Sequence, residues 1–199
     1  MASYYYLMAQ LPYLIYEQKP PISSAGFKAL AETQLIEEDA ALLNCLSIDP
    51  DPEGKTVPSY AELTPSTGCD FIDSWREWER SLRLNLAKNR AGKLKRDNLP
   101  SSSEPPFYPV EAVAAALKAV NTDVSPLEGE FLIDKARWNA IDMLAGNNYF
   151  DRNSVYAYFL KLMLIERRMS FNTERGFTEY KSLYASIIES EHNSLGVPK

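Results

Sequence analysis

Residues Ser125 to Phe171 constrain the fold more than any other part of the sequence, because they specify two consecutive helices. The first has a well-defined start. Ser125 and Glu128 have the spacing of a capping box, in which each side chain accepts a hydrogen bond from the backbone N–H group of the other residue. Pro126 occupies the first helical position, where its missing N–H group costs nothing. Gly146 is the expected end of this helix.

The second helix is predicted to be buried. It begins between Asp151 and Ser154, and the segment from Val155 to Ile165 contains a single charge, Lys161. A helix that is apolar almost all round lies inside a protein. We therefore expect the two helices to pair and to form the core of the C-terminal half. The residues of the first helix expected to face this core are Phe131, Leu132, Trp138, Ile141 and Leu144.

Residues 69–96 carry the longest helical signal in the chain. Glu79 and Arg83 have the order and spacing of a favourable i,i+4 ion pair on this helix. Gly92 could end the helix early. The apolar residues that form one stripe along it are Phe71, Trp75, Trp78, Leu82 and Leu86.

Shorter helices are predicted in most of the remaining segments from apolar residues at helical spacing. The predicted ranges are 24–35 with Ser23 or Ser24 as the cap, 37–46, 110–120 and 173–188. Residues 3–15 are expected to form a short helix or an extended lead-in. Because strand-like alternation is almost absent, we predict an all-α fold of one or more multi-helical bundles.

Proline-rich segments suggest how the chain is divided. Residues 47–68 contain four prolines and are predicted to be a loop, while residues 98–109 are rich in proline and serine and are predicted to be a linker. We therefore expect an N-terminal helical region at residues 1–97 and a C-terminal helical bundle at residues 110–199.

The composition narrows the class of protein. The formal net charge of −6 argues against general nucleic-acid binding, which requires a basic surface. Cys45 and Cys69 do not form a CxxC pair and are expected to be reduced thiols of a cytosolic protein. No signal peptide or membrane-spanning segment is predicted.

Motifs for catalysis or cofactor binding are not found in the sequence. The single histidine, His192, excludes histidine-based triads and most zinc sites, and no phosphate-binding loop is present. We expect no metal, no cofactor and no enzymatic activity.

Two groups of acidic residues have two interpretations each. Glu130 and Asp134 share a helix face with Arg137, which is typical of a solvated face, although paired carboxylates can also serve in acid–base catalysis. Residues 37–39 are all acidic and suit the positive end of a helix dipole, and a divalent ion is the alternative. For both groups we favour the solvated surface.

Basic residues concentrate at the C-terminal end of the predicted long helix. This placement complements the helix dipole, and it can also form a docking patch for an acidic partner or an anionic lipid. The residues of this basic segment are Lys88, Arg90, Lys93, Lys95 and Arg96.

Two stretches resemble known families. The opening residues Tyr4–Pro12 resemble the start of a family of uncharacterised bacterial proteins whose genes lie in V-type ATPase clusters. The central helices are similar in the order and spacing of certain residues to a repeat unit of the funnel-shaped stalk protein of V/A-type ATPases, the one known as C in prokaryotes and as d in eukaryotes. These residues are Glu128, Asp134, Lys135, Trp138, Tyr158, Arg168 and Gly176.

The resemblance implies an all-helical protein that seats the central rotor shaft on the membrane c-ring. The funnel-shaped stalk protein has three repeats, whereas this chain has room for one or two. The implied function is that of a non-catalytic subunit or accessory factor, peripheral to the cytoplasmic face of the membrane. Its implied partners are the central-stalk subunits and the c-ring. The alternatives are a free-standing cytosolic helical adaptor unrelated to the ATPase, and an enzyme that uses acids and tyrosines.

Overall fold

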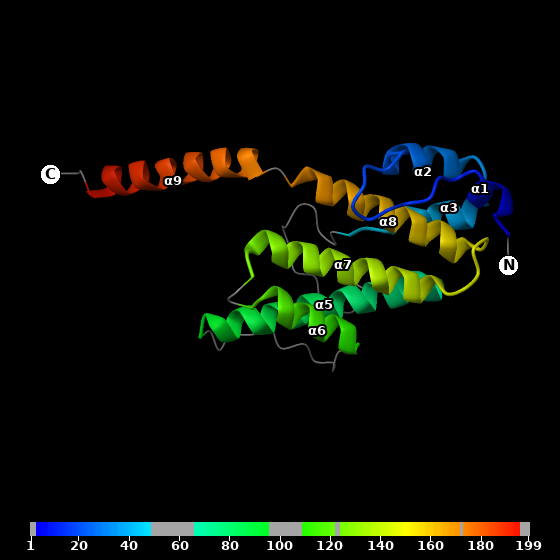
Figure 1. Cartoon of the computed structure of the whole chain (residues 1–199), viewed down its shortest axis with the longest axis horizontal. Coiled ribbons are helices and arrows are strands. Elements are labelled where there is room, and N and C mark those ends of the chain that lie inside the picture. Colours follow the sequence, from blue (N-terminus) through cyan, green and yellow to red (C-terminus); the bar gives the residue numbers. More distant parts are fainter. Residues whose placement is uncertain (1–2, 49–65, 96–108, 122–123, 172, 196–199) are drawn as a thin grey trace. The chain divides into compact units, whose positions relative to one another are not determined.

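The computed structural model describes residues 3–48, 66–95, 109–121, 124–171 and 173–195, and these residues form helices without any strand (Figure 1). The predicted all-α fold is therefore confirmed. The helices are α1 (Tyr5–Ala9), α2 (Ser24–Glu32), α3 (Glu37–Leu43), α5 (Asp70–Lys93), α6 (Val110–Ala119), α7 (Pro126–Ala145), α8 (Arg152–Ser170) and α9 (Thr173–Leu195).

The chain forms two compact units, Met1–Glu166 and Arg167–Lys199. Within the first unit, α5 packs against both α6 and α7, and α6 packs against α7. Helices from both sides of the segment at residues 98–109 therefore belong to this unit. The conformation predicted for most of this segment, and for most of the loop at 47–68, falls outside the described residues.

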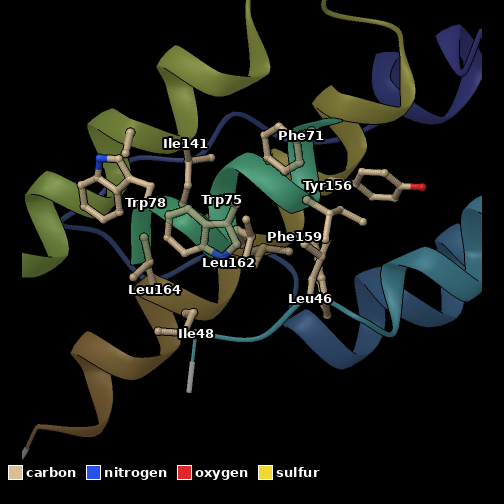
Figure 2. Packing of buried hydrophobic residues seen from close by; sticks show 14 of the residues in the cluster. Leu46, Ile48, Phe71, Trp75, Trp78, Ile141, Tyr156, Phe159, Leu162 and Leu164 are labelled. Carbon is tan, nitrogen blue, oxygen red and sulfur yellow. The ribbon is translucent and has the colours of Figure 1, made fainter. Parts of the chain in front are cut away.

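The core of the first unit is built around α5 and α8. All five residues of the predicted apolar stripe on α5 are buried, and Trp75 and Trp78 stack with their ring centroids 5.8 Å apart. Figure 2 shows these two indoles among Ile141 of α7 and Leu162 of α8. The prediction that the second central helix is buried is confirmed, since eight of the residues from Val155 to Ile165 are buried.

The predicted helix ends are also observed. Ser125 and Glu128 form the capping box of α7, and Gly146 follows the helix with a φ of 72°. Asp151 caps α8 by accepting a hydrogen bond from the N–H group of Ser154 at 2.9 Å. Ser23 caps α2 through the N–H group of Gly26.

Close packing of α7 on α6 depends on Gly129. A Cβ atom at this position would lie 2.8 Å from the carbonyl oxygen of Ala119. Any larger residue would therefore force the two helices apart. Ala112, Ala115 and Ala116 of α6 are buried, as expected for small residues at a close helix contact.

The N-terminal residues are held against the turn between α7 and α8. The segment at residues 3–15 contains the short helix α1, and the N–H group of Tyr4 donates to the carbonyl oxygen of Phe150 at 2.6 Å. Leu7 of α1 is buried in the core. Aromatic contacts from Phe27 of α2 to Tyr158 and Phe159 of α8 extend this core.

The core-facing side of α7 was predicted only in part. Ile141 is buried, but Leu132 is 36% exposed, and Trp138 is only partly buried. Trp138 makes an edge contact with Tyr16 and lies under the ammonium group of Lys161, 4.6 Å from its ring centroid. The buried side of α7 instead carries Gly129, Ile133, Asp134, Arg137, Ala140 and Ile141.

Candidate functional site

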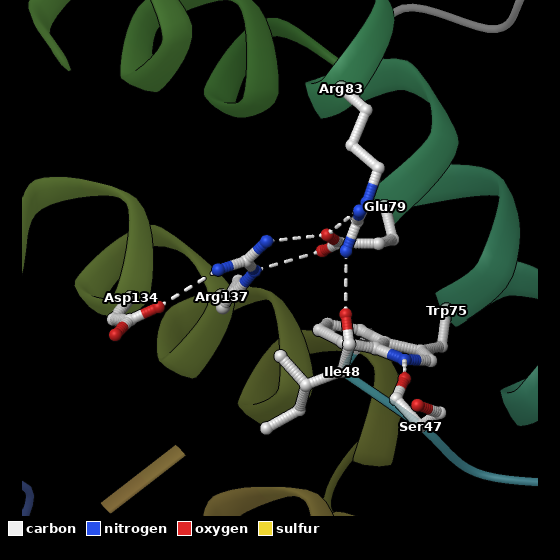
Figure 3. Close-up of polar contacts among 7 residues, drawn as sticks. All are labelled: Ser47, Ile48, Trp75, Glu79, Arg83, Asp134 and Arg137. Atoms are coloured by element: carbon white, nitrogen blue, oxygen red, sulfur yellow. Dashed lines mark hydrogen bonds and ion pairs between the residues drawn. The ribbon is translucent and has the colours of Figure 1, made fainter. Parts of the chain in front are cut away.

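A network of buried charges joins α5 to α7 (Figure 3). The guanidinium group of Arg137 donates from Nη2 to Oε1 of Glu79 at 2.6 Å and from Nε to Oε2 of Glu79 at 3.0 Å. Its Nη1 atom donates to Oδ1 of Asp134 at 2.9 Å. Asp134 is fully buried, Arg137 is 5% exposed and Glu79 is 6% exposed. One buried cation is thus shared by two buried carboxylates.

Arg83 completes this network from the solvent side. It donates to Oε1 of Glu79 at 2.8 Å, which confirms the predicted i,i+4 pair. It also donates to the carbonyl oxygen of Ile48 at 2.6 Å, and the indole N–H group of Trp75 lies 3.5 Å from the carbonyl oxygen of Ser47. The network therefore fixes the segment that follows α3 against α5.

The prediction that Asp134 and Arg137 lie on a solvated face is wrong. Both side chains point into the interface between α5 and α7. Burial alone would lower the pKa of the Arg137 guanidinium, but the carboxylates of Glu79 and Asp134 outweigh burial and raise this pKa. Charged groups in such a place must be paired, because an unpaired buried charge is costly. The oxygens of Glu79 and Asp134 that contact guanidinium groups serve to position two helices.

A second polar cluster surrounds Asp39 at the start of α3. The Tyr4 hydroxyl donates to Oδ2 of Asp39, and Arg152 lies 3.6 Å from its Oδ1 atom. The Tyr156 hydroxyl donates to the backbone carbonyl oxygen of Asp39 at 3.1 Å. Asp39 is only 3% exposed, so the prediction that acidic residues 37–39 lie on a solvated surface is wrong at Asp39. Glu37 and Glu38 remain exposed.

Tyr4, which is buried, and Tyr158, which is partly buried, predict a loss of stability at alkaline pH. Burial and the Asp39 carboxylate raise the pKa of Tyr4 to about 12, and burial raises the pKa of Tyr158 to about 12. The folded state therefore holds these protons more tightly than the unfolded state, whose tyrosines ionise near pH 10. We expect the contribution of these tyrosines to the free energy of unfolding to be fully present below about pH 10 and to be lost as the pH rises towards about 12.

Urea unfolding at a series of alkaline pH values measures this effect. Tyr4→Phe keeps the ring but removes the ionisable hydroxyl, so its stability should depend less on pH in this range. A parent protein whose unfolding midpoint stays constant up to pH 12 would contradict the expectation.

The basic segment lies at the end of α5. Arg90, Lys93 and Lys95 are exposed, and the ammonium group of Lys93 also donates to the carbonyl oxygen of Val120, after α6. The helix continues past Gly92, and Lys95 has a φ of 50°, the left-handed conformation that commonly ends helices. Lys88 is exposed on α5, and Arg96 lies outside the described residues.

An exposed apolar surface on α9 is the feature that sequence reasoning did not identify. The helix itself was predicted, and the spacing of its apolar residues was visible in the sequence. Their exposed fractions lie between 40% and 64%. The residues of this apolar stripe are Phe177, Tyr180, Leu183, Tyr184, Ile187 and Ile188.

Within the described part of the chain, no group of three or more His, Cys, Asp or Glu side chains is arranged to hold a metal ion. No helix among the residues searched is both long and apolar enough to cross a membrane.

Comparison with known proteins gives a match to a family model. Residues 115–190 match the model of a family described as "Protein of unknown function (DUF2764)". The matched region contains the end of α6, all of α7 and α8, and α9 as far as Ser190. No curated protein and no solved structure matches the chain.

Proposed function

We propose that this chain is a non-catalytic subunit or accessory factor of a bacterial V-type ATPase, which helps to couple the central stalk to the membrane c-ring. The ATPase assignment rests on the resemblance of Tyr4–Pro12 and of the central helices to proteins of that system. Glu128, Asp134, Trp138 and Tyr158, which contribute to the resemblance, lie on α7 and α8. The protein would lie at the cytoplasmic face of the membrane.

The observation that best supports a docking role is the exposed basic segment at the end of α5. Arg90 and Lys95 lie on the surface of a chain whose formal net charge is −6. Local positive charge of this kind accelerates association with an acidic partner, and its effect falls as salt screens it. Lys93 is a poorer choice for testing this role, because its ammonium group also contacts Val120.

Reversing Arg90 and Lys95 together to glutamate is expected to weaken docking without unfolding the protein. Exposed substitutions usually change the free energy of unfolding by less than about 0.5 kcal/mol. Association with the ATPase should be slower, and the parent's association should weaken as the Debye length falls from about 10 Å at about 0.1 M salt to about 3 Å at about 1 M. The measurement is co-purification with stalk and ring subunits from native membranes.

Lys19→Glu is the matched control for Lys95→Glu alone, because both lysines are exposed and each single reversal changes the net charge by the same amount. This control should co-purify like the parent. If the Arg90 and Lys95 variant co-purifies normally and without dependence on salt, the basic segment has no docking role and serves only to complement the helix dipole. Recovery of partners unrelated to the ATPase, identified by mass spectrometry, would favour the adaptor alternative.

A further inference from the structure

The apolar stripe of α9 has the spacing of a coiled-coil seam. Phe177, Tyr180, Tyr184 and Ile187 follow one another at intervals of three, four and three residues, as the a and d positions of a heptad do. Each of these side chains is 56–62% exposed. We infer that the stripe pairs α9 with α9 of a second copy of this chain, in antiparallel orientation and centred on Ser182.

The order of the stripe is symmetrical about Ser182. Tyr180 and Tyr184 lie two residues to either side of it, and Phe177 and Ile187 lie five residues to either side. Two antiparallel helices related by a twofold axis at Ser182 therefore place Tyr180 opposite Tyr184 of the second copy. Phe177 then lies opposite Ile187 of the second copy. A surface that is complementary to itself in this way is what a twofold-symmetric dimer requires.

The antiparallel orientation is favoured over the parallel one for two reasons. Antiparallel helices place the positive end of each dipole beside the negative end of the other, whereas parallel helices align like ends. In the antiparallel dimer the two outer pairs of facing side chains also have equal volumes, because each pair combines the large ring of Phe177 with the smaller Ile187. A parallel pair would place two phenylalanines in one layer and two isoleucines in another, which packs less uniformly.

The area of the stripe is sufficient for a weak, specific dimer. An aromatic side chain contributes ~200 Å² when fully exposed, so the exposed parts of the three aromatic rings supply ~350 Å² per helix. Leu183, Ile187 and Ile188 are 64%, 59% and 40% exposed and add to this surface. Both copies together reach ~1,000–1,200 Å², which is the lower limit for specific protein interfaces.

The flanks of the proposed interface differ from each other. On one flank, Leu183 lies beside Leu183 of the second copy and extends the apolar contact. On the other flank, Lys181 lies beside Lys181 of the second copy, and this like-charge pair weakens the dimer. In the free helix the Lys181 ammonium group lies 4.5 Å from the ring centroid of Phe177. A parallel dimer would place Lys181 near Gly176 of the second copy instead, so this flank distinguishes the two orientations.

Sedimentation equilibrium of the full chain over a roughly hundredfold concentration range tests the dimer. We expect reversible dimerisation, and Tyr184→Glu should raise its Kd more than about tenfold because it places a charge in the central layers. Ser182→Glu is the matched control on the opposite face of the same helix and should dimerise like the parent. Ile187→Glu is a second stripe variant. Circular dichroism should show that all variants keep the parent's helix content. A chain that stays monomeric, or a dimer that Tyr184→Glu and Ile187→Glu leave unchanged, would overturn the inference.

Mixing the parent with Lys181→Glu tests the orientation. Each homodimer then contains a like-charge pair, while the heterodimer contains a Lys–Glu pair, so the heterodimer should exceed its statistical share of about one half. Native mass spectrometry of the mixture measures this share. A purely statistical mixture would overturn the antiparallel arrangement.

Discussion

Replacing Arg137 with methionine is expected to lower the free energy of unfolding by about 3–5 kcal/mol. Methionine fills much of the same volume but leaves the carboxylates of Glu79 and Asp134 buried in the α5–α7 interface without their shared cation. The cost arises mainly because both buried carboxylates lose this positive charge, although Glu79 keeps its hydrogen bond from the partly exposed Arg83. Urea denaturation measures it, and an unchanged m-value would show that the comparison concerns stability alone.

Two further variants separate the buried charge from its surroundings. Arg83→Met removes the partly exposed partner of Glu79 and should cost about 1 kcal/mol or less, because its side chain is 38% exposed. Combining Arg137→Met with Glu79→Met and Asp134→Leu removes all three buried charges and should recover most of the lost stability. If the triple variant is as unstable as Arg137→Met alone, unpaired charge does not explain the loss.

Local patterns in the sequence predicted local features of the fold. The capping box at Ser125 and Glu128 and the ion pair of Glu79 with Arg83 each involve residues three or four positions apart. Their geometry follows from the helix alone. The stripe on α5 and the burial of α8 were also predictable, because their apolar residues are dense enough to determine which faces lie inside.

The buried side of α7 was not predictable in the same way. Phe131, Leu132 and Trp138 have the hydrophobicity of core residues, yet Asp134 and Arg137 are more deeply buried. Arg137 is buried because Glu79, 58 residues earlier in the chain, provides its counter-charge. A single sequence shows no sign of such a long-range pair, so the charged residues were assigned to solvent.

The surfaces show the same division between local and long-range information. The basic segment was visible as a local concentration of lysine and arginine, but the bond from Lys93 to Val120 depends on where α6 packs. The apolar spacing of α9 was equally visible. A helical period predicts an apolar face, but it does not show how exposed the side chains of that face are. This explains why the stripe emerged only from the structure.

Trp75→Ala is expected to destabilise the protein by about 3–5 kcal/mol, the usual cost of truncating a buried tryptophan. Trp75 is 2% exposed, its ring stacks on Trp78, and it lies between α5 and the segment that follows α3. Its removal would leave a cavity that the rigid helices around it cannot fill. The free energy of unfolding of a typical domain is only about 5–15 kcal/mol, so this variant should be close to unfolding.

Trp138→Ala is the matched comparison, because it removes the same side chain from a partly buried position. The sequence placed Trp138 in the core, whereas its contacts with Tyr16 and Lys161 lie at the edge of the core. Solvent can fill the space that its indole leaves, so the cavity part of the cost should be small and the loss should be well below that of Trp75→Ala. Thermal and urea unfolding of the two variants, measured side by side, test this order. Equal losses would mean that Trp138 belongs to the core after all.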